Sequence, residues 1–94
     1  MELIHEDDIS RFRELDVPAN FTLHWNGIGY LTGWEKPIGA ERAARRFSIQ
    51  ALIDDGATVS YSSDTTGMTR LYRTSPFFSM QIGHNRQEVG AAPN

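Results

Sequence analysis

The chain has 94 residues, of which 39% are hydrophobic, and its formal net charge is −3 at pH 7. A chain of this length forms one small domain at most and buries roughly 60–65% of its unfolded surface, so we expect marginal stability. The absence of cysteine excludes disulfides and thiolate zinc sites. Because Met1–Asp8 does not resemble a signal peptide and no apolar stretch is long enough for a membrane span, we expect a soluble, cytoplasmic protein.

Basic residues cluster at Arg42, Arg45 and Arg46, and again at Arg70 and Arg73. Charge runs of this kind usually form a solvated helix face, and we interpret them in that way. The overall acidity and the lack of interleaved exposed aromatic residues argue against a nucleic-acid partner.

The N-terminal part of the chain predicts a helix that leads directly into a strand. Acidic residues at 6–8 suit a helix N-terminus, and Ile9, Phe12 and Leu15 recur at the spacing of an amphipathic helix that ends near Asp16. Residues 17–23 then predict a strand, in which proline is tolerable near the first position.

Residues 24–39 form a predicted loop of unusual composition. They include both tryptophans, Trp25 and Trp34, together with four glycines, in a segment longer than most connections. Glycine allows close approach and aromatic side chains supply flat apolar walls, as in small-molecule pockets. The alternative is that these aromatic side chains attach the loop to the core.

Helix and strand signals alternate again in the second half. Residues 40–46 are helix-prone, and residues 47–55 continue either as a second helix or as the second half of the same helix. Gly56 closes this region as a C-cap. Residues 58–63 predict a strand, followed by an irregular stretch to position 74. Ser75 and Pro76 are typical of a helix start, and Gly83 is the expected end of that helix. Residues 87–94 are expected to be a frayed, disordered tail.

Asp64 stands at the end of the second predicted strand. Strand side chains alternate, so one face of this strand is polar: Thr58, Ser60, Ser62 and Asp64. The acid can be a turn or cap residue, or a catalytic or metal-binding carboxylate at the mouth of a parallel barrel.

The order of these elements predicts an α/β fold with a parallel sheet. Two parallel strands can neither close a barrel nor cover both faces of a sheet. We therefore expect the chain to be part of a larger assembly.

Several segments in succession resemble the C-terminal barrel region of the amidohydrolase superfamily, and most closely amidohydrolase family 3. The segments that carry the resemblance are Leu3–Ile9, Phe12–Val17, Ile38–Ala43, Ser48–Gly56 and Ser62–Asp64. The resemblance implies that residues 1–86 are an incomplete fragment of a (β/α)8 TIM-like barrel, with residues 17–23 as the seventh strand and 58–63 as the eighth.

The resemblance also implies a function: hydrolysis of non-peptide C–N bonds of a small-molecule substrate by water activated on a divalent metal, expected to be zinc. Asp64 corresponds to the family's last-strand aspartate, which binds or borders the metal and accepts the proton of the attacking water. His24 and Trp25, after the first strand, would contact the substrate.

The chain departs from the family pattern at the other metal ligands. The His-x-His pair, the bridging lysine and the histidines of the fifth and sixth strands have no counterpart here. His5 is expected to be a surface or cap residue, and His84 to follow a helix C-terminus. We expect this chain alone to be inactive and to bind no metal tightly, and to associate with the missing barrel part or with itself.

Three other interpretations compete with this one. The first is a small α/β binding or interaction module without catalysis, in which the tryptophan loop docks a partner. Residues 64–67 also faintly resemble an aspartic-protease motif, but the surrounding helices disfavour it. A phosphoryl-transfer aspartate lacks the expected glycine-rich phosphate loop.

Overall fold

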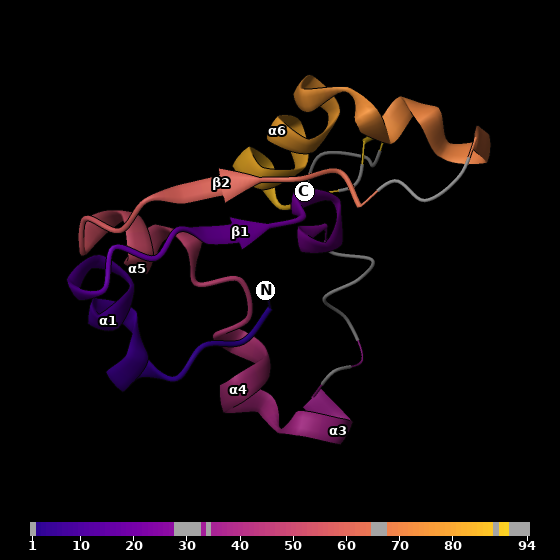
Figure 1. Cartoon of the computed structure of the whole chain (residues 1–94). Helices are drawn as coiled ribbons and strands as arrows, with labels where there is room; N and C mark the ends of the chain where they lie inside the picture. The colour runs from indigo at the N-terminus through magenta and orange to yellow at the C-terminus, as the bar shows by residue number, and fades with distance from the viewer. Residues whose placement is uncertain (1, 28–32, 34, 65–67, 88, 91–94) are drawn as a thin grey trace. The chain divides into compact units, whose positions relative to one another are not determined.

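The computed structural model describes residues 2–27, 33, 35–64, 68–87, 89 and 90. Helices and strands are mixed along this part of the chain (Figure 1). The elements in chain order are the 3-10 helix η1 (Glu6–Asp8), α1 (Ile9–Glu14), β1 (Ala19–Phe21), the 3-10 helix η2 (Leu23–Asn26), α3 (Glu35–Ile38), α4 (Ala40–Ala44), α5 (Ile49–Asp54), β2 (Val59–Tyr61), the 3-10 helix η3 (Met68–Thr74) and α6 (Pro76–Asn85).

The two strands form a parallel sheet, and the predicted α/β class with two parallel strands is confirmed. β1 and β2 lie side by side and point the same way (Figure 1), with Ala19 opposite Val59 and Phe21 opposite Tyr61. Each strand is three residues long and thus shorter than predicted. β1 ends early because the chain enters η2 at Leu23.

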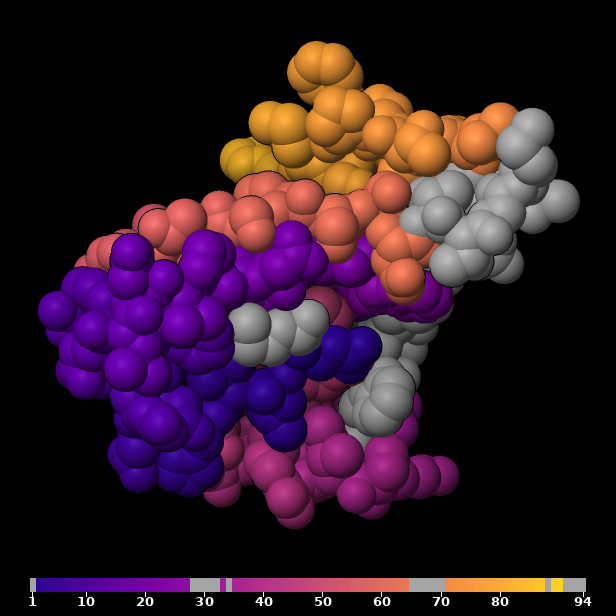
Figure 2. Space-filling model, in the orientation of Figure 1, coloured from indigo at the N-terminus to yellow at the C-terminus, as the bar shows by residue number. Residues whose placement is uncertain are grey.

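The chain divides into two compact units. The first contains Met1–Phe21 and Gly33–Tyr61, and the second contains Thr22–Thr32 and Ser62–Asn94. In the first unit, the N-terminal segment and α1 contribute to the outer surface (Figure 2, indigo and purple).

The predicted N-terminal helix is confirmed as η1 followed by α1. His5 caps it, because its Nδ1 accepts a hydrogen bond from the Asp7 backbone N–H at 3.4 Å. α1 ends at Glu14, and two residues later the chain turns at Asp16, which has a φ of 54°. At that end the N–H groups of Asp16 and Val17 bond to the carbonyls of Arg13 and Phe12, which is the Schellman pattern.

Residues 40–55, predicted as two helices or as two halves of one, form the separate helices α4 and α5. The break lies at Phe47, which has a φ of 57° and a side chain that is only 4% exposed. Its backbone N–H donates to the Glu2 carbonyl oxygen at 2.7 Å. The backbone leaves the helical conformation here, and the phenylalanine ring enters the core beside Phe21, with ring centroids 6.4 Å apart.

The arginines of this region do not form one solvated face, contrary to the sequence-based interpretation. Arg42 is exposed, but the Arg46 side chain is 3% exposed and forms an ion pair with Glu2 at 2.6 Å. Its guanidinium also lies 5.2 Å from the centre of the Phe47 ring. Arg46 is therefore buried among core residues and is neutralised by an acid from the N-terminal segment.

The second unit contains η2, η3 and α6. Leu23 of η2 and Ile82 of α6 are buried. Helix α6 begins as predicted, with Ser75 at the N-cap and Pro76 at the first position, although the serine side chain makes no capping bond. Two predictions are wrong: residues 68–74 form a 3-10 helix, and α6 continues past Gly83.

Gly83 serves packing rather than helix termination. A Cβ placed on it would lie 2.8 Å from Cδ1 of Leu23, so the absence of a side chain lets α6 approach η2. The helix ends instead at Asn85 and is capped by Arg86, whose φ is 56° and whose N–H bonds to the Ile82 carbonyl. Most of the predicted tail, residues 88 and 91–94, lies outside the described residues. Within the described chain, every helix is too short or too polar to span a bilayer.

Candidate functional site

Two of the predicted site residues, Trp25 and Asp64, are in direct contact within the second unit. The indole Nε1–H of Trp25 donates a hydrogen bond to Oδ2 of Asp64 at 3.2 Å. The two residues are 39 positions apart in the chain, and each belongs to the segment that follows one of the two strands. This contact defines the candidate site.

Asp64 turns the chain at the end of the second predicted strand. Its φ is 47°, in the left-handed region that aspartate tolerates better than most residues, which fits its interpretation as a turn residue. The residue is also exposed, so its carboxylate can be reached by solvent and solutes. The turn conformation and an accessible carboxylate are compatible in one residue.

His24 is buried beside Trp25. It is 2% exposed, and its ring centroid lies 4.5 Å from that of Trp25, at an interplanar angle of 47°. In this structure the imidazole therefore has almost no surface to offer a solute. Asn26, at the end of the same 3-10 helix, is equally buried, and within the described chain its Oδ1 accepts no hydrogen bond.

Arg73 also belongs to this site, although the sequence indicated only a solvated basic residue at this position. Its guanidinium carbon lies 5.8 Å from the centre of a Trp25 ring and 5.9 Å from that of Tyr72, which are cation–π distances. Tyr72 in turn packs edge-on against Phe78, with centroids 5.1 Å apart. The contact of Arg73 in η3 with Trp25 in η2 joins residues far apart in the sequence. No local sequence pattern predicts it.

Polar side chains pair next to the strands, as the predicted polar face implies. Within the first unit, Nδ2 of Asn20 donates to Oγ of Ser60 at 3.0 Å. Within the second, the hydroxyls of Thr22 and Ser62 lie 3.3 Å apart. The alternation of Ser60 and Ser62 in the sequence thus corresponds to a polar row that is hydrogen-bonded to the preceding strand segment.

The described residues do not fit a complete metal centre. Among them, no group of three or more histidine, aspartate or glutamate side chains is placed to hold an ion. Zinc in proteins takes at least three protein ligands, and Asp64 would supply one. Any metal bound by this carboxylate would need its other ligands from outside the described part of the chain.

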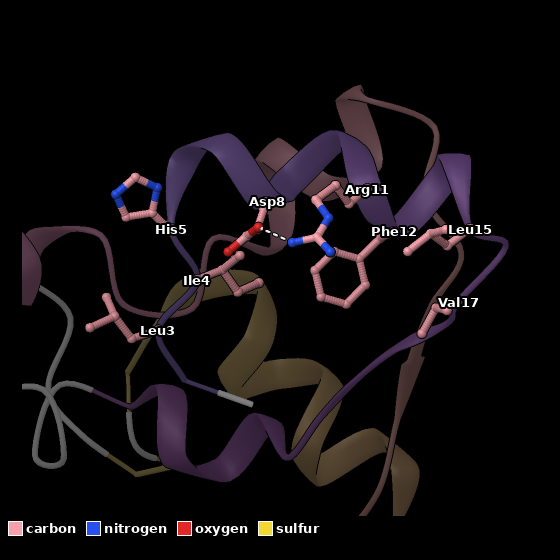
Figure 3. A pocket seen from close by; sticks show the side chains of 8 residues that line it. All are labelled: Leu3, Ile4, His5, Asp8, Arg11, Phe12, Leu15 and Val17. Carbon is pink, nitrogen blue, oxygen red and sulfur yellow. Dashed lines mark hydrogen bonds and ion pairs between the residues drawn. The ribbon is translucent and has the colours of Figure 1, made fainter.

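A separate hollow of about 360 Å³ lies in the first unit (Figure 3). Its walls are mainly apolar side chains from the N-terminal segment, α1 and the approach to β1, including Phe12, Leu15 and Val17. Asp8 and Arg11 form an ion pair at 2.6 Å on its wall. This hollow contains none of the predicted site residues, and its carboxylate is already neutralised by arginine.

The remaining predictions concern histidines and the aromatic loop. His5 is exposed, as expected. His84 is also exposed, but it lies in the last turn of α6 and not, as was expected, after the helix. Residues 28–32 and 34, including Trp34, lie outside the described residues. The described remainder of the predicted loop is partly helical rather than irregular, since it contains most of η2 and all of α3.

Comparisons with known proteins assign this chain to no family. No family model matches the sequence, and neither the characterised proteins nor the solved structures include a match.

Proposed function

We propose that this chain is the C-terminal part of a metal-dependent amidohydrolase of the family 3 type, built on a (β/α)8 barrel in the cytoplasm. Asp64 would accept the proton of the attacking water and pass it to the leaving amine. Trp25 would lie at the substrate side, with the buried His24 packed against it rather than in contact with the substrate. The remaining strands and histidine ligands would come from residues outside this chain. The chain alone would be catalytically inactive.

The observation that carries the proposal is the hydrogen bond between Trp25 and Asp64. In parallel α/β folds, residues that follow neighbouring strands gather at one edge of the sheet, where active sites lie. The 3.2 Å bond joins two such residues, and the carboxylate remains exposed. The parallel pairing of β1 with β2 agrees with adjacent barrel strands.

The catalytic role of Asp64 is tested in the protein encoded by the whole reading frame, with zinc bound and a panel of N-acyl amino acids and cyclic amides as substrates. We expect Asp64→Asn to lower kcat at least about a hundredfold, because an amide cannot accept the proton. Asp54→Asn is the matched control, since Asp54 is an exposed acid on α5. Equal activity of both variants would contradict the proposal.

A non-catalytic interaction module is the second candidate. Large apolar side chains of η3 and α6 are exposed: Leu71, Tyr72, Phe77 and Met80. Phe77 is 77% exposed, which is unusual for a phenylalanine that serves only the fold of its own chain. If this candidate is correct, the protein from the whole reading frame will show no hydrolase activity, and Phe77→Ser will leave the unfolding free energy unchanged.

A further inference from the structure

Trp25 has a role that its assignment as a substrate contact does not include. Its indole N–H can only donate a hydrogen bond, and an ionised Asp64 can only accept one. In the 3.2 Å contact, Trp25 is therefore the donor and Asp64 the acceptor. Hydrogen bonds to a carboxylate are stronger than those between neutral groups. The indole thereby holds one carboxylate oxygen, Oδ2, in a defined position.

The indole is itself held by its neighbours. His24 lies against it at 4.5 Å and is buried, and the Arg73 guanidinium lies 5.8 Å from its ring. The 3-10 helix that carries it is fixed by Leu23, which is 3% exposed and packs at Gly83 of α6. An indole N–H that is held in this way can fix the position of the exposed Asp64 side chain, which would otherwise change rotamer freely.

Asp64 needs such a fixed hydrogen-bond donor if it transfers protons. Its χ angles are not restrained by burial, since the residue is exposed. Among the described residues no hydrogen bond reaches its other oxygen, Oδ1. With Oδ2 bound to the indole, rotation of the carboxylate of this exposed residue is restricted, and so is the position of Oδ1. A base with a fixed orientation reacts faster than one that samples several.

We infer that Trp25 is a positioning residue for Asp64: its indole N–H fixes the carboxylate so that Oδ1 faces the reacting water. This inference rests on the proposed function for its catalytic consequence, whereas the hydrogen bond that carries it can be measured in the isolated chain. The two can therefore fail independently.

The hydrogen bond is tested by ¹⁵N NMR of the isolated chain, in which Trp34→Phe identifies the Trp25 indole resonance. We expect Asp64→Ala to shift the Trp25 Nε1–H resonance and to raise its solvent-exchange rate about twofold to tenfold. Asp64→Asn, which keeps an acceptor oxygen, should change both less. Asp54→Ala is the control and should change neither. Circular dichroism verifies that each variant is folded. An indole resonance that is the same in wild type and in both Asp64 variants would overturn the inference.

The catalytic consequence is tested with Trp25→Phe in the protein from the whole reading frame. Phenylalanine keeps the aromatic surface and removes the donor. We expect kcat to fall about tenfold to a hundredfold with KM within twofold and the zinc content unchanged. A raised KM with unchanged kcat would show a substrate wall and overturn the positioning role. If Asp64→Asn is fully active while the NMR result is as expected, the proposed function fails but the hydrogen bond stands.

Discussion

Gly83 is the residue at which helix propensity and packing oppose each other. Alanine is normally better than glycine inside a helix by about 0.5–1 kcal/mol. At Gly83, however, a Cβ would lie 2.8, 3.2 and 3.4 Å from three carbons of the Leu23 side chain, which is buried and cannot move into solvent. Overpacking of this kind typically costs about 1–3 kcal/mol and therefore outweighs the propensity gain.

We accordingly expect Gly83→Ala to lower the free energy of unfolding by about 1–2 kcal/mol, measured by urea denaturation. Gln81→Ala is the matched control, because Gln81 is exposed on the same helix and its replacement should change stability by less than about 0.5 kcal/mol. A stabilised Gly83→Ala variant would show that α6 and η2 do not pack as described.

Glu2 is the second residue whose effect follows from burial. It is the partner of Arg46, a guanidinium that is almost fully enclosed, whereas Glu2 itself is half exposed. Removal of the acid leaves a buried charge without its carboxylate, so Glu2→Ala should destabilise by about 1.5–3 kcal/mol in thermal or urea unfolding. Glu41→Ala is the control: Glu41 lies 4.0 Å from Arg45 but is 89% exposed, and surface pairs contribute little. Equal effects of the two changes would contradict the buried pair.

At the scale of elements, the turn between α5 and β2 depends on one backbone conformation. Gly56 has a φ of 87°, and the N–H groups of Gly56 and Ala57 bond to the carbonyls of Ile53 and Leu52, completing a Schellman motif. We expect Gly56→Ala to cost about 1–2 kcal/mol, because a Cβ is disfavoured in the left-handed region. Gly56→Asn should cost less, since asparagine tolerates that region. If alanine is as stable as glycine in thermal unfolding, the described turn is wrong.

Elements of this kind were predictable because their causes are local. Gly56 ends a helix through its own backbone freedom, and Ser75 with Pro76 begins one through a fixed φ. The burial of Arg46 was not predictable in this way, because its partner lies 44 residues earlier in the chain. The role of Gly83 was likewise not predictable. The sequence suggests a helix end, but Gly83 lies inside α6 at its contact with Leu23, which is distant in the sequence.

The candidate site was predictable in part for the same reason. The sequence places Asp64 after one strand and Trp25 after another, and parallel pairing brings such ends to one edge. The contribution of Arg73, and the depth at which His24 is buried, depend on how η3 and α6 fold back on η2. No periodicity or composition of residues 64–74 encodes that contact.

At the scale of the whole molecule, the sheet has two parallel strands, and among the described residues they pair with each other. Parallel sheets normally have several strands and are covered on both faces, because their outer edges otherwise expose unpaired N–H and C=O groups. Under the proposed function, this chain would contribute two adjacent strands and Asp64 to a larger parallel sheet.

The most direct test of this account is zinc binding by isothermal titration calorimetry, on the isolated chain and on the protein from the whole reading frame. We expect a tight, stoichiometric site in the proposed longer protein that is weakened by Asp64→Ala. We expect no tight site in the isolated chain, because its described residues offer no group of three suitable ligands. Tight binding by these 94 residues alone, or a longer protein whose zinc affinity does not depend on Asp64, would contradict it.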